Sequence, residues 1–236
     1  MDCAGNCIVS DYGNHSIRCI APNGTVTTLA GSGRAGFADG AGSSAQFKRP
    51  WGVAVDGEGG IIVADHGNHR IRRISPSGNV STLAGSGSAG FADGAGASAQ
   101  FHNPVGVAVD GEGNIIASDW FNHRIRKIVR GGTVSTVAGS GFADGFGDII
   151  GPEGTRLLSV AFQRSYLSSG TSAHFNQPWG VAVDGEGNIL VADNGNTRIQ
   201  RITSSGTVST CFACSGEFRG LVIDTDGMPV AAFFSP

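Results

Sequence analysis

The chain has 236 residues, 16 of them basic and 19 acidic, with a formal net charge of −3. So small a negative charge argues against a broad electrostatic grip on nucleic acid or on an anionic membrane surface. No apolar run approaches the ~18 residues of a membrane-spanning helix. The N-terminus has no basic region followed by an apolar stretch, so no signal peptide is evident, and we expect an intracellular protein.

One unit recurs along the chain. Asp11, Asp65 and Asp119 open similar segments at intervals of 54 residues, and Asp193 opens a fourth copy after 74. A fixed period of this length indicates an array of one supersecondary unit. The 39 glycines recur at fixed offsets within the copies, where tight turns require positive φ. The longer last interval predicts an insert at 148–169.

The second copy contains four short apolar runs, at 51–56, 61–65, 70–75 and 80–84. Each is rich in Val and Ile and is bounded by Gly, Asn, Asp or Pro-Ser-Gly, which predicts strands. The links are short and therefore make antiparallel neighbours. We predict a four-stranded meander, and the radial repetition of such meanders is a β-propeller. The fold class is all-β.

The copies predict one propeller domain over residues 1–236. Its blades are expected at about 2–30 (without the first strand), 51–84, 105–138 and 179–213, followed by a partial blade at 218–236. Two explanations of the incomplete blades stay open. The favoured one is a fragment of a larger propeller, with an open arc of about four to five blades. In the other, residues 219–224 supply the missing strand of blade one and close a small ring.

Long glycine-rich connections follow the fourth strand, at 31–50 and 85–104. Each keeps two aromatic residues at matching places, and we expect both connections to be ordered by these aromatics over one face. In the third strand, arginines flank Ile71 and Ile74, which indicates a strand near a wet edge. Asp65 is expected to pair with Arg70 across the hairpin.

The segment GVAVDGEGNIIVAD-x-x-NHRIRKI resembles the NHL repeat. The Asn-His-Leu-type triplet stands here as Asn14-His15-Ser16, Asn68-His69-Arg70, Asn122-His123-Arg124 and Asn196-Thr197-Arg198. The resemblance covers nearly the whole chain and implies a propeller, commonly six-bladed in that family. Among relatives of this kind are amidating lyases, with zinc and histidines in the central cavity, and RNA-binding modules.

His15, His69 and His123 occupy one position in three blades. Converging imidazoles would make a zinc site. The alternative, which we favour, is a structural role in a turn hydrogen bond, because the position lies between strands two and three and the fourth copy has Thr197 there. We therefore predict no metal site and no cofactor.

Trp120 and Phe121 depart from the pattern, since the other copies carry Gly in the second position. Two large aromatics at an exposed hairpin suggest a contact surface. The surface candidates for binding are Trp120, Phe121, His69, His123, Arg34, Arg70 and Arg124. Cys7 and Cys211 align with core positions, and Cys211 with Cys214 has the spacing of half a redox or zinc site.

These observations favour a non-enzymatic NHL-type scaffold that binds a protein or peptide through its loop-bearing face. Against catalysis, no asymmetric acid–base cluster is visible. A metal-dependent lyase or hydrolase, which the aligned histidines favour, is the alternative. An RNA-binding module is a second alternative, which the low net charge disfavours. No phosphate loop or nucleophile elbow is present.

Overall fold

The computed structural model describes residues 2, 4–143, 149–150, 156–157, 168–213, 217–223 and 229–234. Among them, no helix combines the length and apolar character needed to cross a membrane. Most of the predicted insert at 148–169 lies outside these residues.

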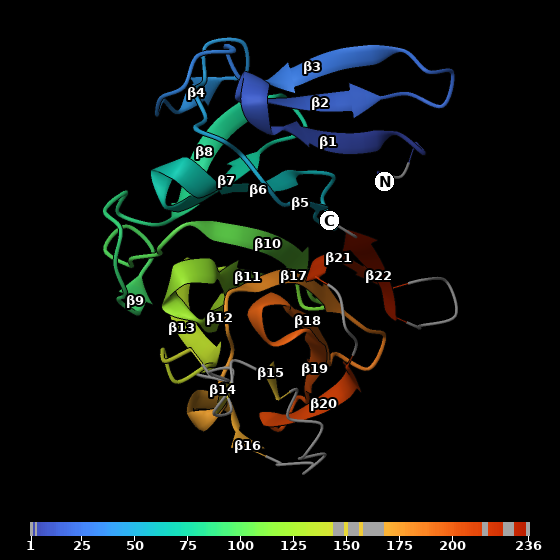
Figure 1. Cartoon of the computed structure of the whole chain (residues 1–236). Coiled ribbons are helices and arrows are strands. Elements are labelled where there is room, and N and C mark those ends of the chain that lie inside the picture. The colour runs from blue at the N-terminus through green and yellow to red at the C-terminus, as the bar shows by residue number, and fades with distance from the viewer. Residues whose placement is uncertain are drawn as a thin grey trace.

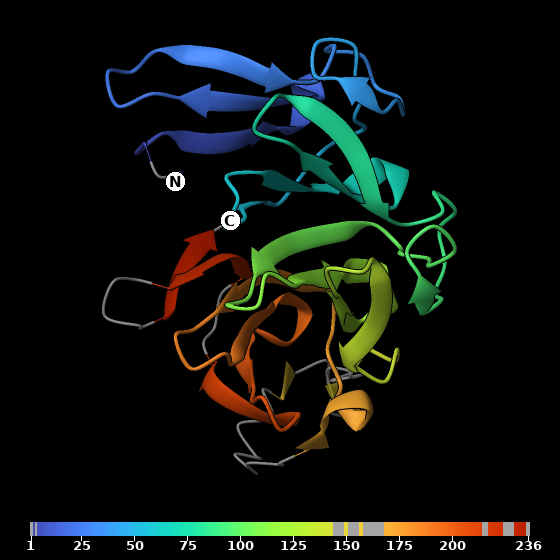
Figure 2. The same ribbon diagram turned by 180° about the vertical axis from the view of Figure 1, so that it is seen from behind.

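Antiparallel sheets stand side by side around a common axis, so the chain forms a β-propeller, as the sequence predicts (Figures 1 and 2). Blade one is the sheet β1 (Cys7–Asp11), β2 (Ser16–Ile20) and β3 (Val26–Ala30). Blade two has the order β5 (Val53–Val55), β6 (Ile61–Asp65), β7 (Arg70–Ile74), β8 (Asn79–Ala84) and β4 (Gly40–Ala41).

The next two blades repeat this order. Blade three is β10 (Pro104–Val109), β11 (Ile115–Asp119), β12 (Arg124–Ile128), β13 (Thr133–Ala138) and β9 (Gly94–Ala95). Blade four is β17 (Pro178–Val183), β18 (Ile189–Asp193), β19 (Arg198–Ile202), β20 (Thr207–Ala213) and β16 (Ser168–Ser169). Two hairpins complete the strands: β14 (Ile149–Ile150) with β15 (Arg156–Leu157), and β21 (Glu217–Ile223) with β22 (Pro229–Phe234).

The first strand of each full blade lies innermost. β10 lies against β5 and β17, and β17 lies against β21. The backbones approach so closely that Gly52 donates its amide to Val105 O at 2.9 Å. A Cβ added at Gly106 would overlap the carbonyl oxygen of Trp179, so glycine is required where neighbouring inner strands meet.

The core consists of apolar layers between neighbouring sheets. Ile62 and Ile71 of blade two pack with Phe101 and Ala117 on the side of blade three. An equivalent layer joins blades three and four, and another joins blades one and two. Burial of Val and Ile on both faces of a sheet is the energetic reason why a single meander would not be stable by itself.

The long connections cross from one blade to the next. After β3 the chain passes to blade two, where β4 pairs with the outer edge of β8, and β9 does the same on β13. Phe47 and Phe101 at the ends of these loops are fully buried, whereas Phe37 and Phe91 are about two-fifths exposed. The loops are thus ordered and held by their aromatic residues. The short fifth strand is a feature that sequence patterns did not indicate.

The described strands leave the first and last sheets separate. β21 pairs with β22 and not with blade one, so the ring closure considered above is not what the structure shows. Cys7 and Cys211 are exposed, contrary to the predicted core positions. Cys7 aligns with buried Ile61, but none of the described strands pairs with the inner edge of β1 as β5 pairs with β6. Cys214 lies outside the described residues.

Candidate binding face

A one-turn 3-10 helix separates the second and third strands of each blade. These turns are η1 (Tyr12–Asn14), η2 (His66–Asn68), η3 (Trp120–Asn122) and η5 (Asn194–Asn196), and η4 (Gly170–Ser172) lies in the connection to blade four. The residue after each blade turn has a left-handed backbone, with φ of 55° at His15, 55° at His69, 52° at His123 and 48° at Thr197. We call the end of the blades that carries η1, η2, η3 and η5 the η face.

The repeated histidines connect successive blades. The Nδ1 of His15 accepts the amide hydrogen of Arg49 at 3.1 Å, and His69 accepts that of Asn103 at 3.1 Å. His123 accepts the amide hydrogen of Gln177 at 3.0 Å. An Nδ1 that accepts a hydrogen bond belongs to a neutral ring protonated on Nε2. The bond therefore runs between blades, where the sequence indicated one within the turn.

Burial lowers the pKa of His69 below its usual value, and the neighbouring His102, Lys48 and Arg70 add to the effect. Burial also lowers the pKa of His123. Both rings are thus held in the neutral form that accepts these bonds. Among the described residues, no three His, Cys, Asp or Glu side chains gather as a set of metal ligands.

In blades two and three a buried arginine of the third strand holds the crossing loop. Arg72 is fully buried, with Nη1 2.7 Å from Asp65 and Nη2 2.6 Å from Asp39 of the loop. It also donates to the loop carbonyls of Ala38 and Gln46, at 2.8 and 3.1 Å. The expected pairing of Asp65 with Arg70 is wrong. The expectation that this strand lies near a solvent-exposed edge is also wrong. The side chain of Arg72 points into the blade junction, where the loop itself supplies the second carboxylate.

Blade three repeats the clamp and blade four varies it. Arg126 pairs with Asp119 at 2.7 Å and with Asp93 at 2.6 Å. In blade four Gln200 donates to Asp193 at 2.6 Å, and Arg198 lies 2.8 Å from the same carboxylate. The sequence expectation of an aspartate paired with the first arginine of the third strand thus holds only in blade four, where the buried arginine is absent.

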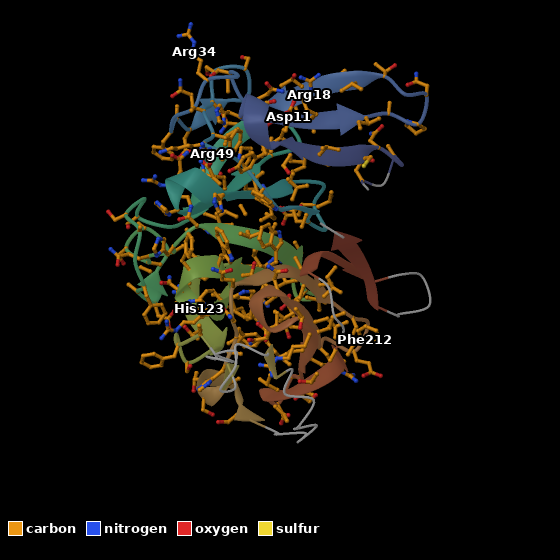
Figure 3. The ribbon with its side chains drawn as sticks, viewed as in Figure 1. Asp11, Arg18, Arg34, Arg49, His123 and Phe212 are labelled. Atoms are coloured by element: carbon orange, nitrogen blue, oxygen red, sulfur yellow. The ribbon has the colours of Figure 1, made fainter. Side chains whose placement is uncertain are left out.

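Arg70 and Arg124 hold the loop from outside. The guanidinium of Arg70 lies 3.8 Å from the ring centroid of Phe37, and that of Arg124 lies 3.8 Å from that of Phe91. Stacking of this kind is a cation–π contact. Arg34 is exposed and projects from the loop between blades one and two (Figure 3). Arg70 and Arg124 are therefore parts of the loop clamp.

Aromatic rings from four blades meet on the η face. Tyr12 lies 4.7 Å from Trp51, Trp51 lies 5.1 Å from Trp179 and 5.7 Å from His66, and Trp120 lies 5.7 Å from His66 and 5.4 Å from Trp179, all between ring centroids. The contact continues outwards, because Phe121 stacks on Trp120 at 4.2 Å and His102 lies 4.9 Å from Phe121. His69 lies 5.8 Å from His102. We call these eight residues the aromatic cluster.

The cluster thus joins three of the candidates, Trp120, Phe121 and His69. It excludes His123, which lies at the next blade junction (Figure 3), and Arg34. The sequence marked Trp51 and Trp179 as weaker contact candidates, and sequence reasoning missed Tyr12, His66 and His102. Tyr12 and His66 share their repeat position with Trp120, but only the curvature of the ring brings the indoles of blades two and four together.

The side chain of Phe121 fits only with a longer hydrogen bond between its turn and the neighbouring loop. The glycine at this position donates its amide to the loop at 2.8 Å in blade two (Gly67 to Lys48) and in blade four (Gly195 to Asn176), but Phe121 donates to His102 at 3.2 Å. A Cβ at Gly67 would lie 2.7 Å from Lys48 O. The side chain therefore pushes the loop outwards in blade three. Phe121 packs on Trp120 with one side and remains 41% exposed.

The indole N–H of Trp120 adds a second cost. It is buried and has no acceptor among the described residues. A buried donor without a partner destabilises a fold by about 1–3 kcal/mol. Residues that cost stability and stay partly exposed are typical of binding surfaces.

The accessible charges near the cluster are positive. Lys48 and Arg49 are exposed, and the Arg49 guanidinium lies 5.8 Å from the ring centroid of Tyr12. The carboxylates at this end of blades two and three, Asp65 and Asp119, are fully buried in the clamps. The opposite end carries the exposed carboxylates of the Asp-Gly-Glu-Gly turns, Glu58, Glu112 and Glu186. Each of these carboxylates lies beside a cation of the same end, namely Arg73 and Arg130, Lys127 or Arg201.

The NHL repeat matches three segments of the chain, residues 47–74, 101–128 and 175–202. The SUPPRESSOR OF QUENCHING 1 protein of Arabidopsis thaliana, a chloroplastic protein, is 38% identical over 91 residues, which are 38% of this chain and 9% of that protein. Human NHL repeat-containing protein 2 is 28% identical over 199 residues, 75% of this chain and 24% of the relative. The chain thus spans a quarter or less of the length of these relatives.

Solved structures show the same fold at low identity. Virginiamycin B lyase from Staphylococcus aureus superposes with a TM-score of 0.59 at 14% identity, over 98% of this chain and 60% of that one. An auxiliary nutrient binding protein from Bacteroides thetaiotaomicron gives 0.57 at 19% identity, over 88% and 46%. With the three matched repeats, the meander sheets and the repeated Asn-His turns, the chain is a β-propeller that contains three NHL repeats.

Proposed function

We propose that the protein is a non-enzymatic scaffold that binds a protein or peptide through the aromatic cluster of the η face. The observation that supports this most is the Trp120–Phe121 stack. Phe121 occupies a position where the other blades carry glycine, its amide makes a longer hydrogen bond to the loop, and its side chain stays exposed. Aromatic residues of this kind are the commonest anchors of protein interfaces.

The charge around the cluster indicates the chemistry of the partner. Lys48 and Arg49 lie at the rim, and the carboxylates nearby are occupied by arginines. A peptide with an aromatic or aliphatic anchor for Phe121 and with acidic residues beside it fits this arrangement. Complementary charge at the rim would speed association more than it would strengthen binding.

The histidines favour this function over a metal-dependent lyase. His15, His69 and His123 each use Nδ1 for a bond to the next blade, so they act at three separate junctions. The lyase among the structural neighbours shares the fold at 14% identity, which carries no activity across.

Peptide display tests the proposal. Random peptides on phage are selected on the protein and counter-selected on the double variant Trp120→His and Phe121→Gly, which gives blade three the residues of blade two. We expect enriched sequences with an aromatic and acidic residues, whose affinity falls at least about ten-fold in the variant. The melting temperature of the variant should not fall, since the replaced side chains cost stability.

Two results would contradict the proposal. One is enrichment of peptides that bind the variant as well as the unmodified protein. The other is binding of single-stranded RNA that competes with the selected peptides and depends on Lys48 and Arg49, which would indicate a nucleic-acid surface.

A further inference from the structure

A cavity of about 420 Å³ opens between blades two and three, at the end of the blades opposite the η face. Its floor is apolar, because Ile62, Ile115 and Ile128 belong to the layer that joins the two blades and Leu83 packs against that layer. Its walls come from two full blades, and every lining residue belongs to the described part of the chain. The volume falls within the range of about 300–1,000 Å³ that is typical of small-molecule sites.

An exposed ion pair stands at the mouth of the cavity. The Nη2 of Arg130 lies 3.2 Å from Oε1 of Glu58, and both side chains are about two-thirds exposed. The pair spans the junction, since Glu58 belongs to the turn between β5 and β6 and Arg130 to the turn between β12 and β13. Ion pairs this exposed contribute little to stability. Little free energy is therefore needed to separate the two charges and turn them towards a ligand.

The other charges of the cavity are engaged within blade two. Asp56 accepts hydrogen bonds from Arg73 at 2.6 Å and from the amides of Glu58 and Gly60 at 3.0 and 2.7 Å. The Nη2 of Arg73 also lies 3.0 Å from Oε2 of Glu58. Separation of the exposed pair thus leaves Glu58 with one paired oxygen and with Oε1 open to a ligand. It leaves Arg130 with all its N–H donors, since Glu58 is its one partner in the described part of the chain.

The turn of blade three departs from the repeat where it lines the cavity. Val129 takes the position of Ser75 in blade two and of Thr203 in blade four, whose hydroxyls accept the backbone amide four residues later, at 3.0 and 3.1 Å. Valine cannot make this bond, and its side chain is 37% exposed at the cavity. Arg130 follows, where those blades carry proline and serine. Blade three thus exchanges a turn hydrogen bond for an apolar group beside a cation.

The turn of blade two departs from the repeat on the facing wall. Asn114 and Asn188 of the next two blades donate to the glutamate of their own turn, at 3.0 and 3.1 Å. Blade two has Gly60 at this position, where a Cβ would lie 2.6 Å from Nη2 of Arg73. Two guanidinium groups therefore hold the glutamate of blade two in place of an amide of its own turn. Departures from a local rule that meet at one cavity are typical of functional sites.

We propose that the cavity binds one amino acid in its zwitterionic form, with a large apolar side chain. Arg130 pairs with the α-carboxylate, which guanidinium groups bind through two parallel hydrogen bonds. Oε1 of Glu58 accepts a hydrogen bond from the α-ammonium group, and the side chain lies on the apolar floor beside Val129. Every charge then has a partner. A ligand with only the carboxylate adds a negative charge beside Glu58 and Asp56, and one with only the ammonium group adds a positive charge beside Arg73, so both fit less well.

Calorimetric titrations of the whole chain with L-phenylalanine, phenylpropionate and phenylethylamine test the proposal. We expect phenylalanine to bind with a dissociation constant below about 10 mM, and both analogues at least about five-fold more weakly, since each lacks one charge. Arg130→Ser, which gives blade three the residue of blade four, and Glu58→Gln should each weaken phenylalanine binding by at least about five-fold. Arg130→Ser should not weaken the binding of phenylethylamine, nor Glu58→Gln that of phenylpropionate. Arg34→Ser, at an exposed arginine that does not line the cavity, is the matched control.

Equal melting temperatures of the three variants establish that the fold is intact, and several results would then overturn the inference. One is the absence of saturable phenylalanine binding up to about 10 mM. Another is equal binding of phenylalanine and either analogue, which would mean that the apolar floor alone holds the ligand. Affinity that Arg130→Ser leaves unchanged would also contradict it. Because the aromatic cluster lies at the opposite end, Phe121→Gly should bind phenylalanine normally, and a loss of binding in that variant would place the amino acid at the η face instead.

Discussion

Replacement of Arg126 by Ala tests the idea that buried arginine clamps hold the blades together. The guanidinium is fully buried and lies 2.7 Å from Asp119, which is also fully buried, and 2.6 Å from Asp93. Removal of one partner of a buried ion pair costs about 3–5 kcal/mol, because the other charge stays buried without compensation. In a chain of this size each kcal/mol lowers the melting temperature by about 2–4 °C, so we expect a fall of about 6–20 °C.

Two matched variants make the test specific. Arg126→Gln gives blade three the residue of blade four, whose amide still reaches the aspartate, and should cost less than Arg126→Ala. Arg18→Ala removes an arginine that no described carboxylate pairs with, and should change the free energy of unfolding by less than about 0.5 kcal/mol. Urea and thermal unfolding measure all three. A cost of Arg126→Ala no larger than that of Arg18→Ala would refute the reasoning.

Gly106→Ala should destabilise the protein by more than about 2 kcal/mol, because its Cβ would overlap the backbone of the next inner strand. Gly111→Ala has open space around it and should be neutral within about 1 kcal/mol in urea unfolding. Equal effects of the two substitutions would contradict the close approach of the inner strands. Burial lowers the pKa values of His66, His69 and His123, so the folded chain binds fewer protons than the unfolded chain below the unfolded pKa of 6.5. The contribution of these rings to the free energy of unfolding should therefore fall as the pH falls from 7.5 to 5.5. Urea titrations of the unmodified chain and of His69→Gln at each pH isolate this contribution from that of the buried Asp65 and Asp119, whose raised pKa values act in the opposite direction. A difference between the two chains that does not change with pH would be inconsistent with a neutral bridging ring.

The sequence was sufficient for the repeating architecture. Val and Ile in short runs, glycines at fixed offsets and the period of 54 residues reflect local chemistry, and they place the strands within a residue or two. In the structure the inner strands need Gly52 and Gly106, because neighbouring backbones meet there. Local sequence patterns do not predict contacts between residues that are distant in the sequence.

Arg72 illustrates that failure. The alternation of arginine with Ile71 is typical of a strand with one face in solvent. The second carboxylate that pairs with Arg72, Asp39, comes from a loop 33 residues earlier, and a sequence pattern does not place that loop. The histidine bonds likewise join residues 34 or 54 positions apart. The aromatic cluster depends on the angle between blades, which brings Trp51 and Trp179 together across the intervening blade. Such contacts are consequences of the ring and follow only from its geometry.

The location of the bound peptide tests the central claim most directly. The chain has three tryptophans, so its indole N–H groups give three assignable nuclear magnetic resonance signals, with Trp120 identified by Trp120→Phe. We predict that a peptide selected by display shifts the Trp120 signal and the His102 ring signals, and that Phe121→Gly removes both effects. Shifts confined to the Asp-Gly-Glu-Gly turns, with the Trp120 signal unmoved at saturation, would contradict binding at the η face.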